Sequence, residues 1–110
     1  MPFYMFQGQY TSDSIKTLVD SPQDREAAAR GMIEALGGTL HHFFFCFGSD
    51  DVVAIMEMPD DKAMTAGSML VGASGAMSSG RTTKLMTMAD AMDAMASAGG
   101  AKGHYHPVKS

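Results

Sequence analysis

Residues 39–58 read TLHHFFFCFGSDDVVAIMEM, and this stretch decides the fold. Two runs rich in aromatic and β-branched residues, 39–47 and 52–58, flank a GSDD segment at 48–51. Aromatic and β-branched residues favour strands, whereas Gly, Ser and Asp favour tight turns, so we predict an antiparallel hairpin. Both strands carry apolar side chains on both faces, which indicates that each face of the sheet is covered.

The residues before the hairpin predict one strand and one helix. Residues 3–10 are aromatic-rich and apolar on both faces, which is typical of a central strand. Residues 11–20 are mostly polar and lead into Ser21 and Pro22, which favour the N-cap and the first position of a helix. We expect this helix to cover residues 22–36 and to end at the glycine pair that follows. Its predicted inner face consists of Ala29, Met32, Ile33 and Leu36.

The residues after the hairpin predict a helix, a strand and a short extra helix. Asp60 or Asp61 caps the first of these helices, which reaches about Ala73. A flexible run of small residues then leads to a fourth strand over 81–88, and the extra helix covers 89–98, where two glycines end it. The resulting β-α-β-β-α-β order predicts an α+β fold with a four-stranded antiparallel sheet.

Composition limits the classes of partner. We divide the 110 residues into one domain, 1–98, and a flexible glycine-rich tail, 99–110. The formal net charge of −4 comes without a basic patch, which argues against nucleic acid and anionic membranes as partners. Cys46 is the single cysteine, the chain begins without the features of a secretory signal, and no apolar run is long enough to span a bilayer. We therefore expect a cytoplasmic protein.

Methionine is unusually frequent, at 12 of 110 residues. Thioether sulfur is a soft ligand that suits Cu(I), but here the methionines follow helix and strand spacing instead of clustering in a loop. We therefore interpret them as packing residues or as an adaptable apolar interface, and we expect no metal and no cofactor.

Four short phrases occur in a fixed order along the chain: GQYT at 8–11, DSP at 20–22, GSDDVVAI at 48–55 and RTT at 81–83. Together they resemble the GYD-domain family over about residues 2–88. The resemblance implies a small bacterial protein with a ferredoxin-like fold that associates as a dimeric α+β barrel, and it implies no particular reaction. The family pattern has a tyrosine where this chain has Asp50, so any role of that tyrosine is lost here or taken by a carboxylate.

The candidate ligand-binding residues are His42, His41, Tyr10, Asp51 and Arg81. Neighbours on a strand point to opposite faces, so we expect only one of the two histidines to meet the helix layer, which excludes a chelating pair. We favour His42, because its predicted face includes the small Cys46 and leaves space for a ligand. A neutral imidazole in a pocket is a plausible general base. The alternative is a histidine satisfied by one hydrogen bond at a strand edge or subunit contact.

Arg81 and Asp51 each have a structural alternative to ligand binding. The guanidinium of Arg81 can hold a carboxylate of a ligand, or it can form an ion pair with Asp51 or Glu57. The carboxylate of Asp51 can instead bind the backbone amides of its own turn.

Two functions are consistent with these residues. The first is a homo-oligomeric protein that binds a small organic ligand between the sheet and the helices. The second is a cofactor-independent enzyme of the monooxygenase, isomerase or dehydratase type acting on a small aromatic or carbonyl compound. A pocket that joins His41 or His42 to Arg81 or Tyr10 would favour the enzyme, whereas a pocket filled by Phe and Met side chains would favour binding.

Overall fold

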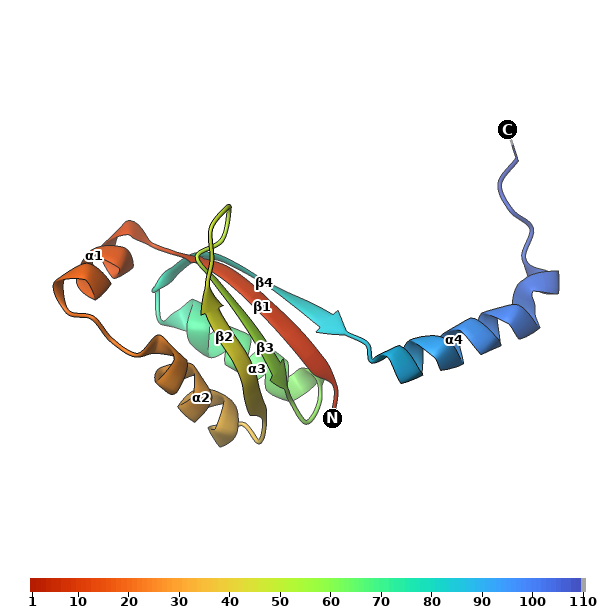
Figure 1. Cartoon of the computed structure of the whole chain (residues 1–110), viewed down its shortest axis with the longest axis horizontal. Helices are drawn as coiled ribbons and strands as arrows, with labels where there is room; N and C mark the ends of the chain where they lie inside the picture. The colour runs from red at the N-terminus through yellow and green to blue at the C-terminus, as the bar shows by residue number, and fades with distance from the viewer. Residues whose placement is uncertain (110) are drawn as a thin grey trace.

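In the computed structural model, which describes residues 1–109, the chain forms a four-stranded antiparallel sheet with the strand order β2-β3-β1-β4 (Figure 1). β1 (Phe3–Tyr10) and β3 (Val52–Glu57) are central, and β2 (Thr39–Phe45) and β4 (Met77–Leu85) are the edges. β2 and β3 form the predicted hairpin. This arrangement is a ferredoxin-like α+β fold, so the predicted fold class is confirmed.

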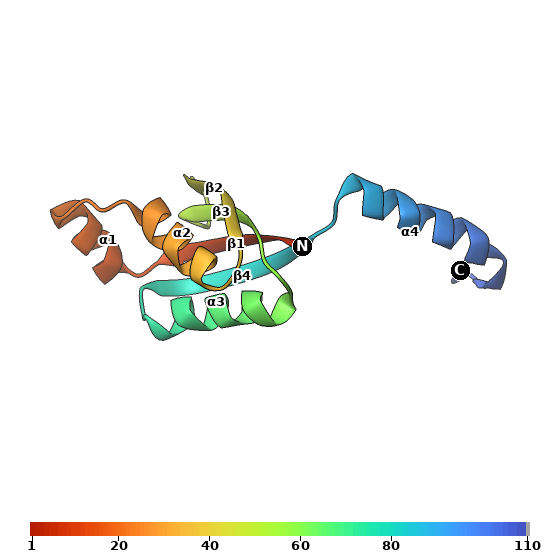
Figure 2. The ribbon, with the colours of Figure 1, turned by 90° about the horizontal axis from the view of Figure 1, so that it is seen from below.

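α2 (Arg25–Ala35) and α3 (Asp61–Ala73) cover one face of this sheet (Figure 2). The core lies between that face and the two helices, where Ile33 of α2 and Met64 of α3 are buried against the sheet. The predicted inner face of α2 is confirmed, because its other apolar residues pack against the same cluster. The opposite face of the sheet carries no helix of the described chain. The sheet contributes four buried side chains to the core: Tyr4, Leu40, Ala54 and Met56.

The polar segment after β1 forms a helix that the sequence did not predict, α1 (Ser12–Asp20). The side chain of Thr11 caps it by accepting a hydrogen bond from the Ser14 amide at 3.1 Å. No residue of α1 is buried, although Ile15, Leu18 and Val19 recur at i, i+3, i+4, so the sequence carried a short helical pattern that the prediction missed. α2 begins at Arg25 and not at Pro22, because its N-cap is Asp24 instead of the predicted Ser21.

β2 contains an irregularity that changes which side chains share a face. Leu40 pairs with Met56 and His42 pairs with Ile55, so His41 is an extra residue in β2. Such a bulge breaks the alternation of a strand. Both histidines consequently lie on the face away from the helices, and the prediction that they point to opposite faces is wrong.

The last strand and the last helix both have bounds that differ from the predicted ones. β4 begins at Met77, because the small residues before Arg81 pair with the end of β1 instead of forming a flexible run. α4 (Met88–Ala101) follows after two residues and extends away from the sheet (Figure 1). It runs through both glycines that were expected to end it, and the short 3-10 helix η1 (Lys102–His104) continues it.

Candidate ligand-binding site

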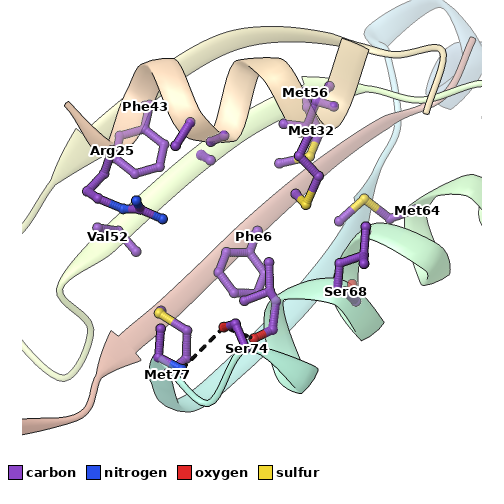
Figure 3. A pocket seen from close by; sticks show the side chains of 18 of the residues that line it. Phe6, Arg25, Met32, Phe43, Val52, Met56, Met64, Ser68, Ser74 and Met77 are labelled. Carbon is purple, nitrogen blue, oxygen red and sulfur yellow. Dashed lines mark hydrogen bonds between the residues drawn. The ribbon is translucent and has the colours of Figure 1, made fainter. Parts of the chain in front are cut away.

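A cavity of about 220 Å³ lies between the inner face of the sheet and the helices α2 and α3 (Figure 3). An apolar cavity of about 150 Å³ is already large enough to admit benzene. This cavity can therefore hold a small organic molecule. Its lining is mostly apolar and includes Phe6, Met32, Phe43, Val52, Met64 and Val71.

Glycines create part of this space. A Cβ atom at Gly80 would lie 2.9 Å from the ring of Phe6, and a Cβ atom at Gly8 would overlap the methyl group of Met77. Gly8 and Gly80 are paired across β1 and β4. Because neither has a side chain, the Phe6 ring and the Met77 methyl group lie directly over the backbone of these glycines and form the floor of the cavity. On α3, a Cβ atom at Gly67 would lie 3.4 Å from Leu36, which is ordinary van der Waals contact.

Arg25 is the only charged residue in the described lining of this cavity. It is the first residue of α2, and its side chain reaches from the helix towards the cavity (Figure 3). Among residues 1–109, no carboxylate lies within ion-pair distance of its guanidinium. The hydroxyl of Ser74, which also lines the cavity, is occupied by the Val71 carbonyl at 2.6 Å and by the Ala76 amide at 3.2 Å.

A second, more polar hollow of about 390 Å³ adjoins the first at α1. Arg25, Tyr10, Ser74 and Ala76 line both, so Arg25 stands where an apolar space meets a polar one. The other polar residues of the second hollow are Thr11, Asp13, Ser14, Thr17 and Gln23.

Of the five residues predicted from the sequence, Tyr10 alone lines the cavity. The two histidines lie on the open face of the sheet. The ring of His41 stacks on Phe3 with centroids 5.5 Å apart, and its Nε2 is 2.7 Å from the carboxylate of Glu57. The ring of His42 stacks on Phe44 at 6.0 Å. The histidines are therefore separated from the cavity by the sheet.

Arg81 and Asp51 make structural contacts at the end of β1. Arg81 forms an ion pair with Asp50 at 2.8 Å, so its partner is neither of the carboxylates considered above, and it also donates to the Gln7 side chain at 3.3 Å. Asp51 accepts a hydrogen bond from the Tyr10 amide at 2.9 Å, which ties the hairpin to β1 instead of bonding its own turn. The carboxylate at the family's tyrosine position, Asp50, is thus buried and paired.

A further polar network joins β1, α3 and β4 outside the cavity lining. The hydroxyl of Tyr4 donates to Asp61, and Lys84 lies 2.9 Å from the same carboxylate. Burial, followed by the hydrogen bond to Asp61, raises the pKa of Tyr4 to about 12. The hydrogen bond from Tyr4, followed by that from Lys84, lowers the pKa of Asp61. Both shifts favour a protonated Tyr4 beside an ionised Asp61 at neutral pH.

Residues 1–109 contain neither a candidate metal site nor a candidate membrane-spanning helix. No group of three or more His, Cys, Asp or Glu side chains is placed to hold a metal ion in this part of the chain. None of its helices is long and apolar enough to cross a membrane.

Comparison with known proteins agrees with the observed fold. The sequence profile of the GYD domain matches residues 4–95. No curated protein matches the chain in sequence.

Three solved structures illustrate the likeness in fold. MtbAldR superposes with a TM-score of 0.56 at 14% identity, covering 78% of this chain and 53% of that one, so the chain spans about half the length of MtbAldR. FFRP-DM1 superposes with a TM-score of 0.50 at 9% identity, covering 78% of this chain and 100% of that one. An antibiotic biosynthesis monooxygenase gives 0.49 at 12% identity, covering 80% and 99%. At these identities the likeness concerns the fold alone.

Proposed function

The chain belongs to the GYD-domain family, and we propose that it is a homo-oligomeric protein that binds a small, largely apolar organic ligand between the sheet and helices α2 and α3. The observation that carries this proposal is the cavity of about 220 Å³ with an apolar lining. Concave, mostly apolar sites with a few polar groups are typical of small-molecule binding. For a ligand of about ten non-hydrogen atoms, we expect a Kd in the micromolar to millimolar range.

The enzyme alternative has less support. An acid-base mechanism needs a titratable group within reach of the ligand. His41 and His42, the residues considered for that role, lie on the other face of the sheet, so Tyr10 lines the cavity without either histidine. A lining of Phe and Met side chains supports binding.

The open face of the sheet supports self-association. Phe44 is 59% exposed there, and the charged groups of this face are already paired within the chain, Arg81 with Asp50 and His41 with Glu57. A second copy would therefore meet an apolar surface without like-charge repulsion, whereas a strongly charged partner would find no complementary charge. The apolar side chains of this face include Phe3, Met5, Val53, Ile55 and Leu85.

Helix α4 gives a second reason to expect association. Met88, Met92 and Met95 recur on one side of it at helical spacing and are 70%, 60% and 64% exposed. An isolated helix of 14 residues is marginally stable in water, so we expect it to pack on a second copy. The proposal places the protein in the cytoplasm, where a free cysteine such as Cys46 stays reduced.

Methyl NMR on the full chain tests the ligand site directly, because methionines lie both in the cavity and far from it. In protein labelled with ¹³C at the methionine methyl groups, titration with octanol should shift the Met32, Met64 and Met77 signals in a saturable way. The Met92 and Met95 signals serve as internal controls and should stay in place. Saturable shifts at α4 with none in the cavity would refute the site.

A further inference from the structure

Arg25 gives the cavity a charged end, and from its position we infer that the ligand is an apolar monocarboxylate whose acid group is held by the Arg25 guanidinium. This inference rests on the proposed function and adds the chemical class of the ligand. Arg25 is partly buried, and it lines both the apolar cavity and the polar hollow beside it. A molecule with an apolar body and an acid head fits this pair of spaces.

The other arginines of the chain differ from Arg25 in having carboxylate partners. Arg30, on the same helix, pairs with Glu26 at 2.9 Å, and Arg81 pairs with Asp50 at 2.8 Å. Arg25 has no such partner among residues 1–109, although Asp13 lines the same polar hollow. A guanidinium beside an apolar wall has lost part of its hydration, so an anion that reaches it gains more than it would in water.

The number of charges selects the type of anion. Arg25 is the single cation in the described lining of both spaces, and Asp13 adds a negative charge to the polar hollow. One guanidinium offers a planar fork that matches a carboxylate with two parallel hydrogen bonds. A phosphate dianion would bring a second negative charge that no further lysine or arginine of these spaces would neutralise. The single positive charge and its planar fork therefore favour a carboxylate over a phosphate.

The position of Phe43 also favours an elongated ligand. Phe43 lies with Arg25 in the lining, while Phe6 and Met64 lie further along the same cavity (Figure 3). With its carboxylate at Arg25, a ligand can extend its hydrocarbon part past Phe43 towards Met64. Polar hydroxyls at the α1 side, including Thr11 and Ser14, border the end that holds the acid group.

Calorimetry on the full-length chain at neutral pH tests the inference with octanoate, octanamide and octanol as probes. We expect octanoate to bind at least tenfold more tightly than the two neutral probes. Arg25→Gln should remove this preference and leave the octanol Kd unchanged. Arg30→Gln is the matched control, because it removes an arginine of α2 that pairs with Glu26, and it should change none of the three affinities.

The possible outcomes separate this inference from the proposed function. If octanol and octanamide bind wild-type protein as tightly as octanoate, the acid class is wrong and the cavity remains a binding site. If no probe binds up to its solubility limit, the proposed function itself fails. Should Arg25→Gln not fold, the comparison of the three probes on wild-type protein still decides, and Arg25→Lys, which keeps the charge and loses the fork, should retain part of the preference.

Discussion

Filling the cavity with a side chain of the protein should abolish ligand binding and stabilise the fold. Ser68 lies on α3 in the lining of the cavity, and Ser68→Phe would place a benzene-sized ring there (Figure 3). Burial of the ring contributes about 1.5–3 kcal/mol. Loss of the hydrogen bond between Ser68 and Thr82, at 3.3 Å and exposed, costs about 0.5–1.5 kcal/mol.

The expected net effect is a gain of about 1 kcal/mol in the free energy of unfolding, which is within the usual range for cavity-filling substitutions. For a domain of about 100 residues this corresponds to an increase of roughly 4–8 °C in Tm. Thermal denaturation measures the stability, and calorimetry with octanol measures the binding. Thr65→Phe is the matched control, because Thr65 is exposed on the same helix and does not line the cavity.

Two results would refute this reasoning. Unchanged octanol binding by Ser68→Phe would mean that the ligand lies elsewhere. A loss of stability in Ser68→Phe that Thr65→Phe does not share would mean that the space between α2 and α3 cannot accept a ring.

Four further predictions concern the fold and the assembly. Because the pKa of Tyr4 is raised to about 12, its contribution to stability should be complete below about pH 10 and lost as the pH rises through 12, and urea unfolding of Tyr4→Phe should lack this alkaline loss. The lowered pKa of Asp61 acts in the opposite direction, so its contribution should be lost on acidification, and Asp61→Asn should lack that part of the acid dependence. Phe44→Glu should weaken self-association at least tenfold by sedimentation velocity, because its side chain is exposed in the single chain on the proposed interface; an unchanged assembly would exclude the open face as the interface. Gly38→Ala should destabilise by about 1–3 kcal/mol, because its Cβ would overlap the Glu57 carbonyl, whereas Gly31→Ala, with open space around it, should stabilise the helix.

The elements that local chemistry determines were predictable from the sequence. Alternation and turn residues located the β2–β3 hairpin, and Asp60 was correctly named among the caps of α3, where its side chain accepts from the Ala63 amide at 2.8 Å. α1 was missed because its segment is mostly polar and buries no residue, although Ile15, Leu18 and Val19 recur in it at helical spacing. The first residues of β4 are small and polar, and they adopt strand geometry because β1 pairs with them, which is a tertiary effect.

The position of the cavity could be predicted from the sequence, but the presence of Arg25 in its lining could not. The apolar face of α2 and the inner face of the sheet could both be recognised from the sequence, so a ligand site between them was expected. Arg25 was missed because the helix was expected to begin at Pro22, which made the first turn seem a capping region. One signal was available: Arg25 precedes Ala29 and Met32 at i, i+4, i+7 spacing, so a charged residue occupies the apolar face of α2.

The bulge in β2 explains why the histidines and the cavity are separated, and it leads to a last prediction. The extra residue at His41 places Phe43 on the cavity side and leaves His42 on the open side with Phe44. His42 was assigned to a ligand site because its predicted face included the small Cys46 and left space for a ligand. That reason does not hold, because His42 lies on the open face of the sheet, away from the cavity. We now expect His42→Ala to leave the octanol affinity within twofold of wild type and to weaken self-association, because its ring covers Phe44 on the surface that would meet a second copy. Calorimetry and sedimentation velocity on the same sample separate the two effects. A loss of octanol binding with unchanged assembly would return His42 to the ligand site and would mean that the ligand occupies the open face.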